Sequence, residues 1–308
     1  MASTALGGER AGAPGPDDRA IAVDIGGTKL AVGLVDGSGA VMSRQTAPTP
    51  TEDGDLMWSV LRTMVDDVAA DGGAIVVGVG SGGPMTRGGD LLSPLNIPGW
   101  RDFPLRARLA EHTGLPVFVD NDAKALARAE GWVGAATGVS DYIAMVVSTG
   151  VGGGIVLDGR LLDGAAGNAG HIGHVIVEPD GRACACGARG CLEAEASGTS
   201  IAAIVGRPAA EAPPEVRRRT GMLVGRAVAS VANLLDLRLA VVAGSVALGY
   251  GDAFFDAAQA ELDRSARLDF STGTRIVPSG CAGDGPLIGA AAVGFVGVGR
   301  DVGPVTAG

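Results

Sequence analysis

The chain has 308 residues, of which 46% are hydrophobic, and this length and composition are typical of a globular protein of about two domains. Its 52 glycines and 16 prolines make up about a fifth of the chain, below the range of roughly 25 to 30% that indicates low-complexity disorder. The formal net charge of −10 disfavours nucleic acid and anionic membrane surfaces as partners, since no basic patch offsets it.

Residues 1–19 contain no apolar segment of the kind found in secretory signals, and we expect them to form a disordered tail. The apolar run 142–157 is shorter than the roughly 20 residues that cross a bilayer, and Ser, Thr and Gly interrupt it. We therefore expect a cytoplasmic protein with no membrane partner. Its four cysteines should be reduced and free for burial or metal binding.

The first half of the chain begins with two apolar stretches around the turn Gly26-Gly27, and this pattern predicts a β-hairpin. The elements expected next are a helix at 56–69, a strand at 75–79, a Gly- and Pro-rich loop at 81–100, a helix at 105–112, and a strand at 117–119 that runs into Asn121-Asp122 and a further helix.

The second half repeats the hairpin layout without repeating the sequence. A strand at 142–147 leads into a glycine-rich segment at 148–154, and a strand resumes at 155–157. The remaining elements expected are a His- and Cys-rich loop at 170–193, a loop at 206–214, a helix at 216–235, a strand at 239–243 and a closing helix at 287–295. The alternation of strands and helices predicts an α/β protein.

Four soft metal ligands occur within eighteen positions, in the spacing H-x9-C-x-C-x4-C. They are His174, Cys184, Cys186 and Cys191. This set suits a closed tetrahedral zinc site with no open position, and so predicts a structural role for the metal. We interpret Cys281 as a small buried hydrophobic residue.

Two glycine-rich segments have two readings each. Asp24 ends a strand and precedes a turn with uncovered backbone amides, which either cradles phosphate or simply needs positive φ. The segment 148–154 either wraps a phosphate chain or lets elements pack closely. Neither matches the phosphate-binding loop with Gly-Lys-Ser/Thr or a strand-linked G-x-G-x-x-G motif with its ribose-binding acid.

Asp122 likewise has two readings, a helix N-cap or a general base within reach of a hydroxyl. His171 precedes His174 by three residues, and because the cysteines complete a metal site with His174, His171 is free to face a ligand.

Together, in this order, the motifs resemble the ROK family (repressors, open reading frames and kinases) of sugar kinases from about Ile21 to Phe295. The matching segments are the phosphate motif at 24–29, the second glycine loop at 149–154, the Asn-Asp pair at 121–122, and the zinc signature formed by His174, Cys184, Cys186 and Cys191 with Glu193 after it.

The resemblance implies a two-domain actin-like, ribonuclease H-like ATPase fold with an interdomain cleft. An N-terminal α/β domain would span 20–121 and be completed by a C-terminal helix at about 287–298. A C-terminal α/β domain would span 122–286 and contain the zinc-binding loop 170–193.

The resemblance also implies an ATP-dependent kinase that phosphorylates the 6-hydroxyl of a hexose or an N-acetylhexosamine, with Asp122 as the base and Asp24 helping to hold Mg²⁺. The phosphates would be held by Gly26, Gly27, Thr28, Lys29, Thr149, Gly150, Gly152 and Gly153, and Gly244 would lie near the adenosine. Sugar hydroxyls would be bound by Asn96, Asn121, His171, His174 and Glu193.

His171 stands where many glucose-specific members of the family carry Glu. A neutral His offers one donor and one acceptor, which favours an acetamido sugar, and Gly-His-Ile-Gly-His also resembles bacterial N-acetylmannosamine kinases. Glucose or mannose is the alternative substrate, and a non-catalytic sugar-sensing protein is a further alternative. The resemblance leaves open whether polyphosphate replaces ATP, and it implies a homodimer.

Overall fold

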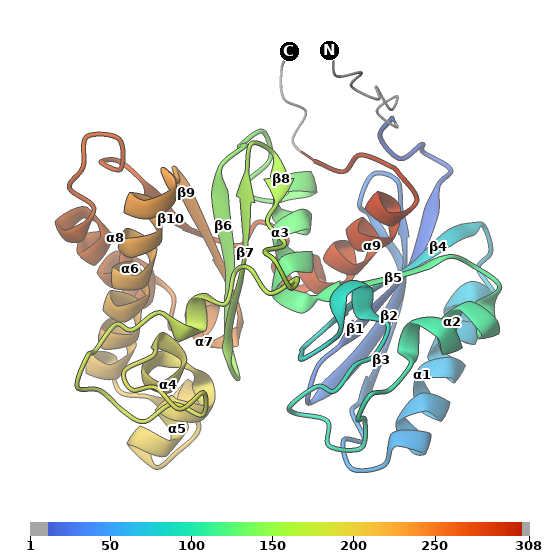
Figure 1. The fold of residues 1–308 in the computed structure, drawn as a ribbon, viewed down its shortest axis with the longest axis horizontal. Helices are drawn as coiled ribbons and strands as arrows, with labels where there is room; N and C mark the ends of the chain where they lie inside the picture. The colour runs from blue at the N-terminus through green and yellow to red at the C-terminus, as the bar shows by residue number, and fades with distance from the viewer. Residues whose placement is uncertain (1–11, 304–308) are drawn as a thin grey trace, which may run out of the picture.

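The first of two β-sheets is built from the N-terminal part of the chain, in a computed structural model that describes residues 12–303 (Figure 1). Its five strands follow the order β3-β2-β1-β4-β5, with β1 antiparallel to β2 and parallel to β4. The strands are β1 (Arg19–Ile25), β2 (Lys29–Asp36), β3 (Val41–Pro48), β4 (Ala74–Ser81) and β5 (Val117–Asn121). The predicted first hairpin is confirmed.

The second sheet repeats this topology. Its order is β10-β9-β6-β7-β8, with β6 antiparallel to β7 and parallel to β9, so the repeated layout expected from the sequence is confirmed. The strands are β6 (Tyr142–Val147), β7 (Val151–Leu157), β8 (Arg160–Leu161), β9 (Leu239–Ala243) and β10 (Arg275–Pro278). The strand predicted to resume at 155 begins instead at Val151, because the glycines themselves pair with β6.

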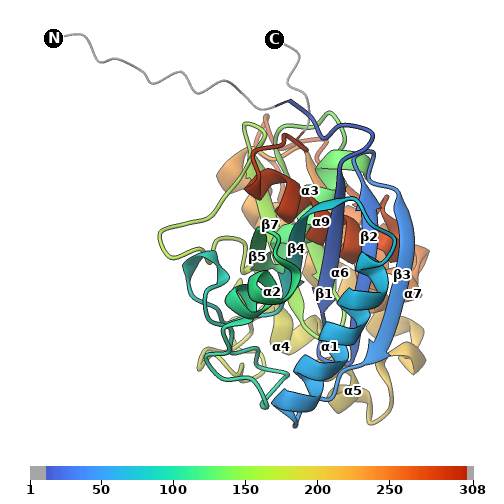
Figure 2. The same cartoon turned by 90° about the vertical axis from the view of Figure 1, so that its right-hand side faces the viewer.

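Two helices cover one face of the first sheet, α1 (Gly54–Ala69) and α2 (Leu105–Thr113). Asp53 caps α1 by accepting hydrogen bonds from two backbone N–H groups, which is why this helix begins before the predicted residue 56. The buried side chains of α1 and α2 pack with Ile21, Val23 and Ile25 of β1 in one apolar cluster. Figure 2 shows both helices on this side of the sheet.

The opposite face of the first sheet is covered by the C-terminal helix α9 (Gly285–Gly297), whose alanines pack against Ala20 and Ala22 of β1. Gly78 of β4 has no room for a side chain, because the carbonyl of Ala290 lies directly against it. Helix α3 (Asp122–Val133) lies between the two sheets in Figure 1 and packs on α9, β6 and β7. Trp132 of α3 meets Phe295 of α9 edge-on, with ring centroids 5.8 Å apart.

The second sheet is covered on its outer side by the long helices α6 (Pro214–Leu235) and α8 (Asp252–Ser265), which pack against each other through one large apolar cluster. Three short helices complete this lobe, α4 (Leu192–Ala196), α5 (Gly198–Val205) and α7 (Ser245–Tyr250). Since α3, at the expected domain boundary, packs against both sheets, the division into domains 20–121 and 122–286 stays a prediction.

The predicted disordered tail 1–19 is corrected in part. Residues 1–11 lie outside the described residues, but β1 begins at Arg19 and residues 12–18 lie against the C-terminal segment. Arg300 pairs with Asp18 at 3.0 Å, and the backbone N–H of Asp301 donates to the carbonyl of Gly12. Within residues 12–303, none of the helices combines the length and apolar character needed to cross a membrane.

Candidate active site

Asp24 and Asp122 lie at the same end of the first sheet, separated by a glycine. The strand register aligns Asp24 of β1 with Gly80 of β4 and with Asp120 of β5, and Asp122 begins α3 directly after β5. A Cβ at Gly80 would lie only 3.7 Å from the Cα of Asp122. Gly80 therefore leaves the space between the two carboxylates free of a side chain.

The electrostatics of this pair favour a bound cation. Burial and the nearby Asp122 carboxylate raise the pKa of Asp24 to about 7, although Lys29 acts in the opposite sense. Asp122 is open to solvent on one side, yet the protein atoms packed around its carboxylate raise its pKa by desolvation, against hydrogen bonds from Ala123 and the charge of His171. Hard carboxylate oxygens of this kind fit Mg²⁺.

Asn121, not Asp122, caps α3. The Asn121 Oδ1 accepts hydrogen bonds from the backbone N–H groups of Ala123 at 3.0 Å and Lys124 at 3.3 Å. Asp122 uses only Oδ1, which accepts from Ala123 N at 2.8 Å. Within residues 12–303, its Oδ2 has no hydrogen-bond partner. The N-cap reading of Asp122 is therefore wrong, and one carboxylate oxygen is available for chemistry.

The first glycine turn brings Asn96 next to the phosphate motif. Gly26 N donates to the carbonyl of Lys29 at 3.1 Å, and neither Gly26 nor Gly27 has positive φ. The reading that these glycines serve only a positive φ is therefore wrong. A Cβ on Gly27 would lie 2.7 Å from the Cβ of Asn96, so the absence of a side chain allows this approach. Thr28 is exposed on the same turn.

The second glycine turn, between β6 and β7, is held by Glu193 of α4. Glu193 Oε2 accepts a hydrogen bond from the backbone N–H of Val151 at 3.0 Å, and a Cβ on Gly150 would lie 2.9 Å from the same oxygen. Thr199 Oγ1 donates to the carbonyl of Thr149 at 3.0 Å. Glu193 is therefore bound to the turn by one oxygen.

The glycines of β7 allow close packing of elements, which is the alternative to phosphate binding that the sequence left open. A Cβ on Gly152 would lie 3.1 Å from the Cβ of Ala123, and one on Gly154 would lie 2.8 Å from that of Ala127. The start of α3 therefore rests directly on β7. A phosphate-binding role for Gly152 and Gly153 stays a prediction.

Gly244 lies where the ends of β6 and β9 meet. Its φ is 101°, and the backbone of Val147 fills the place of a Cβ, so a larger residue is excluded on both grounds. Ser245, the next residue, lies 3.0 Å from Ser148 through their Oγ atoms. Gly244 is thus adjacent to the second glycine turn.

The four predicted zinc ligands are brought together. The ligand atoms of His174, Cys184, Cys186 and Cys191 all lie within 4.8 Å of one another. Cys186 Sγ is 3.7 Å from Cys191 Sγ, and Cys184 Sγ is 3.8 Å from His174 Nδ1. Zinc–sulfur bonds of roughly 2.3 Å in a tetrahedron place sulfurs about 3.8 Å apart, so this donor set fits Zn²⁺. Cys281 is buried elsewhere, as predicted.

The His- and Cys-rich loop 170–193 is fixed to the second lobe by Glu195, whose side chain is only 1% exposed. Glu195 Oε2 lies 2.9 Å from Arg182 and 2.8 Å from Arg219 of α6. On the same loop, the rings of His171 and His174 are 6.1 Å apart. His171 is also close enough to Asp122 for its charge to oppose the rise in the pKa of that carboxylate, so the loop that carries the candidate metal ligands lies near Asp122.

The comparisons with known proteins agree with this geometry. A model of the ROK family matches residues 20–294. The chain is 39% identical to the N-acetylmannosamine kinase of Citrobacter koseri over 248 residues, 75% of this chain and 84% of that protein. It is 42% identical to the glucokinase of Thermotoga maritima over 191 residues, 60% of this chain and 59% of that protein. The chain belongs to the ROK family.

Solved ROK structures share the fold. The ROK hexokinase from Thermus thermophilus covers 91% of this chain and 99% of its own, with a TM-score of 0.77 and 34% identity. The match to the ROK glucokinase from Streptomyces griseus in complex with glucose and AMPPNP covers 90% of this chain and 99% of that protein, with a TM-score of 0.79 and 29% identity. The predicted membership and the actin-like ATPase fold are confirmed.

A buried lysine two residues after Asp122 was not assigned a role from the sequence. Lys124 is 4% exposed, and its Nζ lies 2.8 Å from Asp120 and 2.7 Å from Asp163. Asp163 follows β8 and precedes the His- and Cys-rich loop 170–193. The ion pair between Lys124 and Asp163 thus connects the start of α3 to the segment that leads to His171. Lys124 is one of only two lysines in the chain, and this scarcity was the feature of the sequence that could have drawn attention to it.

Proposed function

We propose that this ROK protein transfers the γ-phosphoryl group of ATP to the 6-hydroxyl of an N-acetylhexosamine, with N-acetylmannosamine as the leading substrate. The observation that carries the proposal is the Asp122 carboxylate, which keeps Oδ2 free at the start of α3 while Asn121 caps the helix. A base must offer such a free oxygen to the hydroxyl from which it takes a proton.

In the proposed reaction, Asp122 takes the proton of the sugar 6-hydroxyl as that oxygen attacks the γ-phosphorus. The bond between the γ-phosphorus and the bridging oxygen breaks, and ADP leaves with that oxygen. A pKa raised by desolvation strengthens the carboxylate as a proton acceptor. Phosphoryl transfer needs mainly alignment and charge neutralisation, which the two lobes supply from either side.

Asp24 would help to hold Mg²⁺, and the metal would neutralise charge on the phosphates. The backbone amides of Gly27 and Gly150 form no hydrogen bond within residues 12–303, and with Gly26, Thr28, Lys29 and Thr149 they would hold the phosphate chain. Gly244 would lie beside the adenosine. The close pair of carboxylates supports this assignment, because its mutual repulsion is relieved by a cation.

The sugar would lie against Asn96, Asn121, His171 and Glu193, with the zinc cluster holding His174 and therefore the loop that carries His171. His171 supports an N-acetylhexosamine because one donor and one acceptor suit an acetamido group better than a bare diol. The relatives named N-acetylmannosamine kinase support the same substrate. The relative and solved structure named glucokinase support glucose or mannose as the second candidate.

A coupled assay of ADP release across glucose, mannose, N-acetylglucosamine and N-acetylmannosamine tests the proposal, with polyphosphate as an alternative donor. We expect turnover with ATP and highest kcat/KM for N-acetylmannosamine. Asp122→Asn should still bind the sugar but lose about 10² to 10⁴ in kcat. A near-normal kcat in this variant would refute the base, and sugar binding without any turnover would favour a sugar sensor. Sedimentation would test the homodimer that the family resemblance implies.

A further inference from the structure

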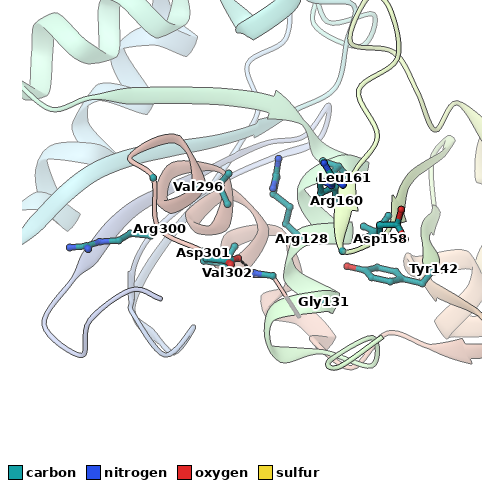
Figure 3. A pocket seen from close by; sticks show the side chains of 14 residues that line it. Arg128, Gly131, Tyr142, Asp158, Arg160, Leu161, Val296, Arg300, Asp301 and Val302 are labelled. Atoms are coloured by element: carbon teal, nitrogen blue, oxygen red, sulfur yellow. Dashed lines mark hydrogen bonds between the residues drawn. The ribbon is translucent and has the colours of Figure 1, made fainter. Parts of the chain in front are cut away.

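A polar cavity lies at the opposite end of the second sheet from the residues described above. Its volume is about 720 Å³, and its lining includes residues from the start of β6 and from the turn between β7 and β8 (Figure 3). The second glycine turn joins the other ends of β6 and β7, so the sheet itself separates the two places. None of the residues proposed to bind sugar, nucleotide or metal lines this cavity.

The cavity is built from both lobes. Val302 of the segment after α9 packs in the apolar cluster of the first sheet, with Ala20 and Ala22. Tyr142 and Leu161, across the cavity, belong to a cluster of the second sheet. An occupant would therefore contact both lobes at once.

The cavity carries guanidinium groups without protein partners. Arg128 of α3 has a buried Nε with no hydrogen-bond partner in the described part of the chain, and such groups need an explanation. Arg160 of β8 lines the same cavity and forms no ion pair within residues 12–303. Arg300, the third lining arginine, is turned away in Figure 3 and pairs with Asp18. Guanidinium groups of this kind bind phosphate well.

Two carboxylates share the lining. Asp158 and Asp301 form no ion pair within residues 12–303, and Asp301 Oδ1 accepts only from the backbone N–H of Gly303 at 2.9 Å. Carboxylates repel a bare anion but accept hydrogen bonds from hydroxyl groups. The arginines and aspartates together fit a ligand that carries a phosphate and hydroxyls.

We propose that this cavity binds a sugar phosphate, with Arg128 and Arg160 holding the phosphate and Asp158 and Asp301 accepting from its hydroxyls. The volume is within the roughly 300 to 1,000 Å³ typical of small-molecule sites. Arg128 lies six residues after Asp122, about 9 Å further along the same helix. The ligand would therefore contact the helix that carries the base.

The test is calorimetric titration of the full chain with glucose 6-phosphate, after the active site is filled with AMPPNP and the panel sugar that binds best. We expect binding to persist in this filled protein. Arg128→Met and Arg160→Met should each weaken it at least tenfold, whereas Arg62→Met, a change of an exposed arginine on α1, should leave it unchanged. Because Arg160 is exposed, its replacement leaves the fold intact and keeps the test valid.

Three results would overturn the proposal. The first is no binding to the filled protein, and the second is equal weakening by the Arg62 change, which would mean nonspecific attraction. The third is that inorganic phosphate binds as tightly as glucose 6-phosphate, which would remove the role of Asp158 and Asp301. Since the readout is binding, failure of the proposed kinase activity would leave these outcomes interpretable.

Discussion

Glu193 accepts, through Oε2, a hydrogen bond from the backbone N–H of Val151 at 3.0 Å. Glu193 follows the candidate zinc ligand Cys191 by two residues, and Val151 ends the glycine turn that we expect to hold phosphates. The bond therefore joins the proposed sugar side of the site to its phosphate side, across 42 residues of sequence.

Replacing Glu193 should affect both substrates. Glu193→Ala removes the acceptor for Val151 N, and the loss of about 0.5 to 1.5 kcal/mol should raise the KM for ATP some 2- to 10-fold, together with the KM for the sugar. Glu193→Gln keeps an acceptor oxygen and should leave the KM for ATP nearly unchanged. Steady-state kinetics of both variants measure this. A change in the sugar KM alone for the alanine variant would contradict the coupling.

Asp24→Asn should stabilise the metal-free protein while abolishing activity. In the folded protein the pKa of Asp24 is raised to about 7, from 3.8. The folded state thus holds this proton more tightly than the unfolded state, so stability falls as the pH rises from about 4 to about 7. The increase in the free energy of unfolding caused by Asp24→Asn should be larger at pH 8 than at pH 5.5, by on the order of 1 to 2 kcal/mol.

Thermal unfolding in EDTA at the two pH values measures this gain. The same raised pKa means that a proton competes with Mg²⁺, so the apparent affinity for Mg²⁺ should fall as the pH drops below about 7. A gain in Tm that is equal at both pH values would show that Asp24 does not titrate in this range.

Removing one zinc ligand should act on the sugar more than on the nucleotide. Cys186→Ser leaves three ligands, and the loop that carries His171 then loses its fixed position, so we expect zinc loss and an increase in sugar KM of about tenfold or more. Cys281→Ala is the control, because Cys281 lies outside the cluster. Zinc content by mass spectrometry and KM for both substrates give the result. Full zinc retention by the serine variant would argue against the site.

His171→Glu should shift preference toward glucose. A carboxylate accepts hydrogen bonds from two neighbouring hydroxyls, whereas a neutral His accepts only one. We expect the ratio of kcat/KM for glucose to that for N-acetylmannosamine to increase about tenfold or more. His112→Glu, far along the chain on α2, serves as a charge-matched control. An unchanged ratio would remove His171 as a determinant of specificity.

Sequence patterns predicted most features that depend on residues close together in the chain. The four candidate zinc ligands lie within one loop, so their spacing alone predicted that they come together, and the strands flanking each glycine turn were recognisable from apolar runs. The adjacency of Asp24 and Asp122 depends on the order β1-β4-β5, which no local pattern encodes. The same holds for the contact of Lys124 with Asp163, which are 39 residues apart.

Some elements gave weak signals. Strand β3 is at the edge of its sheet and carries mostly exposed residues, so its sequence lacks the apolar run of a buried strand. Helix α8 and strand β10 were also not predicted. The sequence did not indicate the early start of β7, because glycine has low strand propensity. The close packing of α3 explains why glycines occupy this strand.

The position of α9 limits how the polypeptide can be divided. Its alanines cover the face of the first sheet that includes Ala20 and Ala22, although more than 200 residues separate them in sequence. A fragment ending at residue 121 would leave that face bare to water, and it should aggregate instead of folding autonomously. Synthesis on the ribosome must therefore complete nearly the whole chain before the first lobe can close its core.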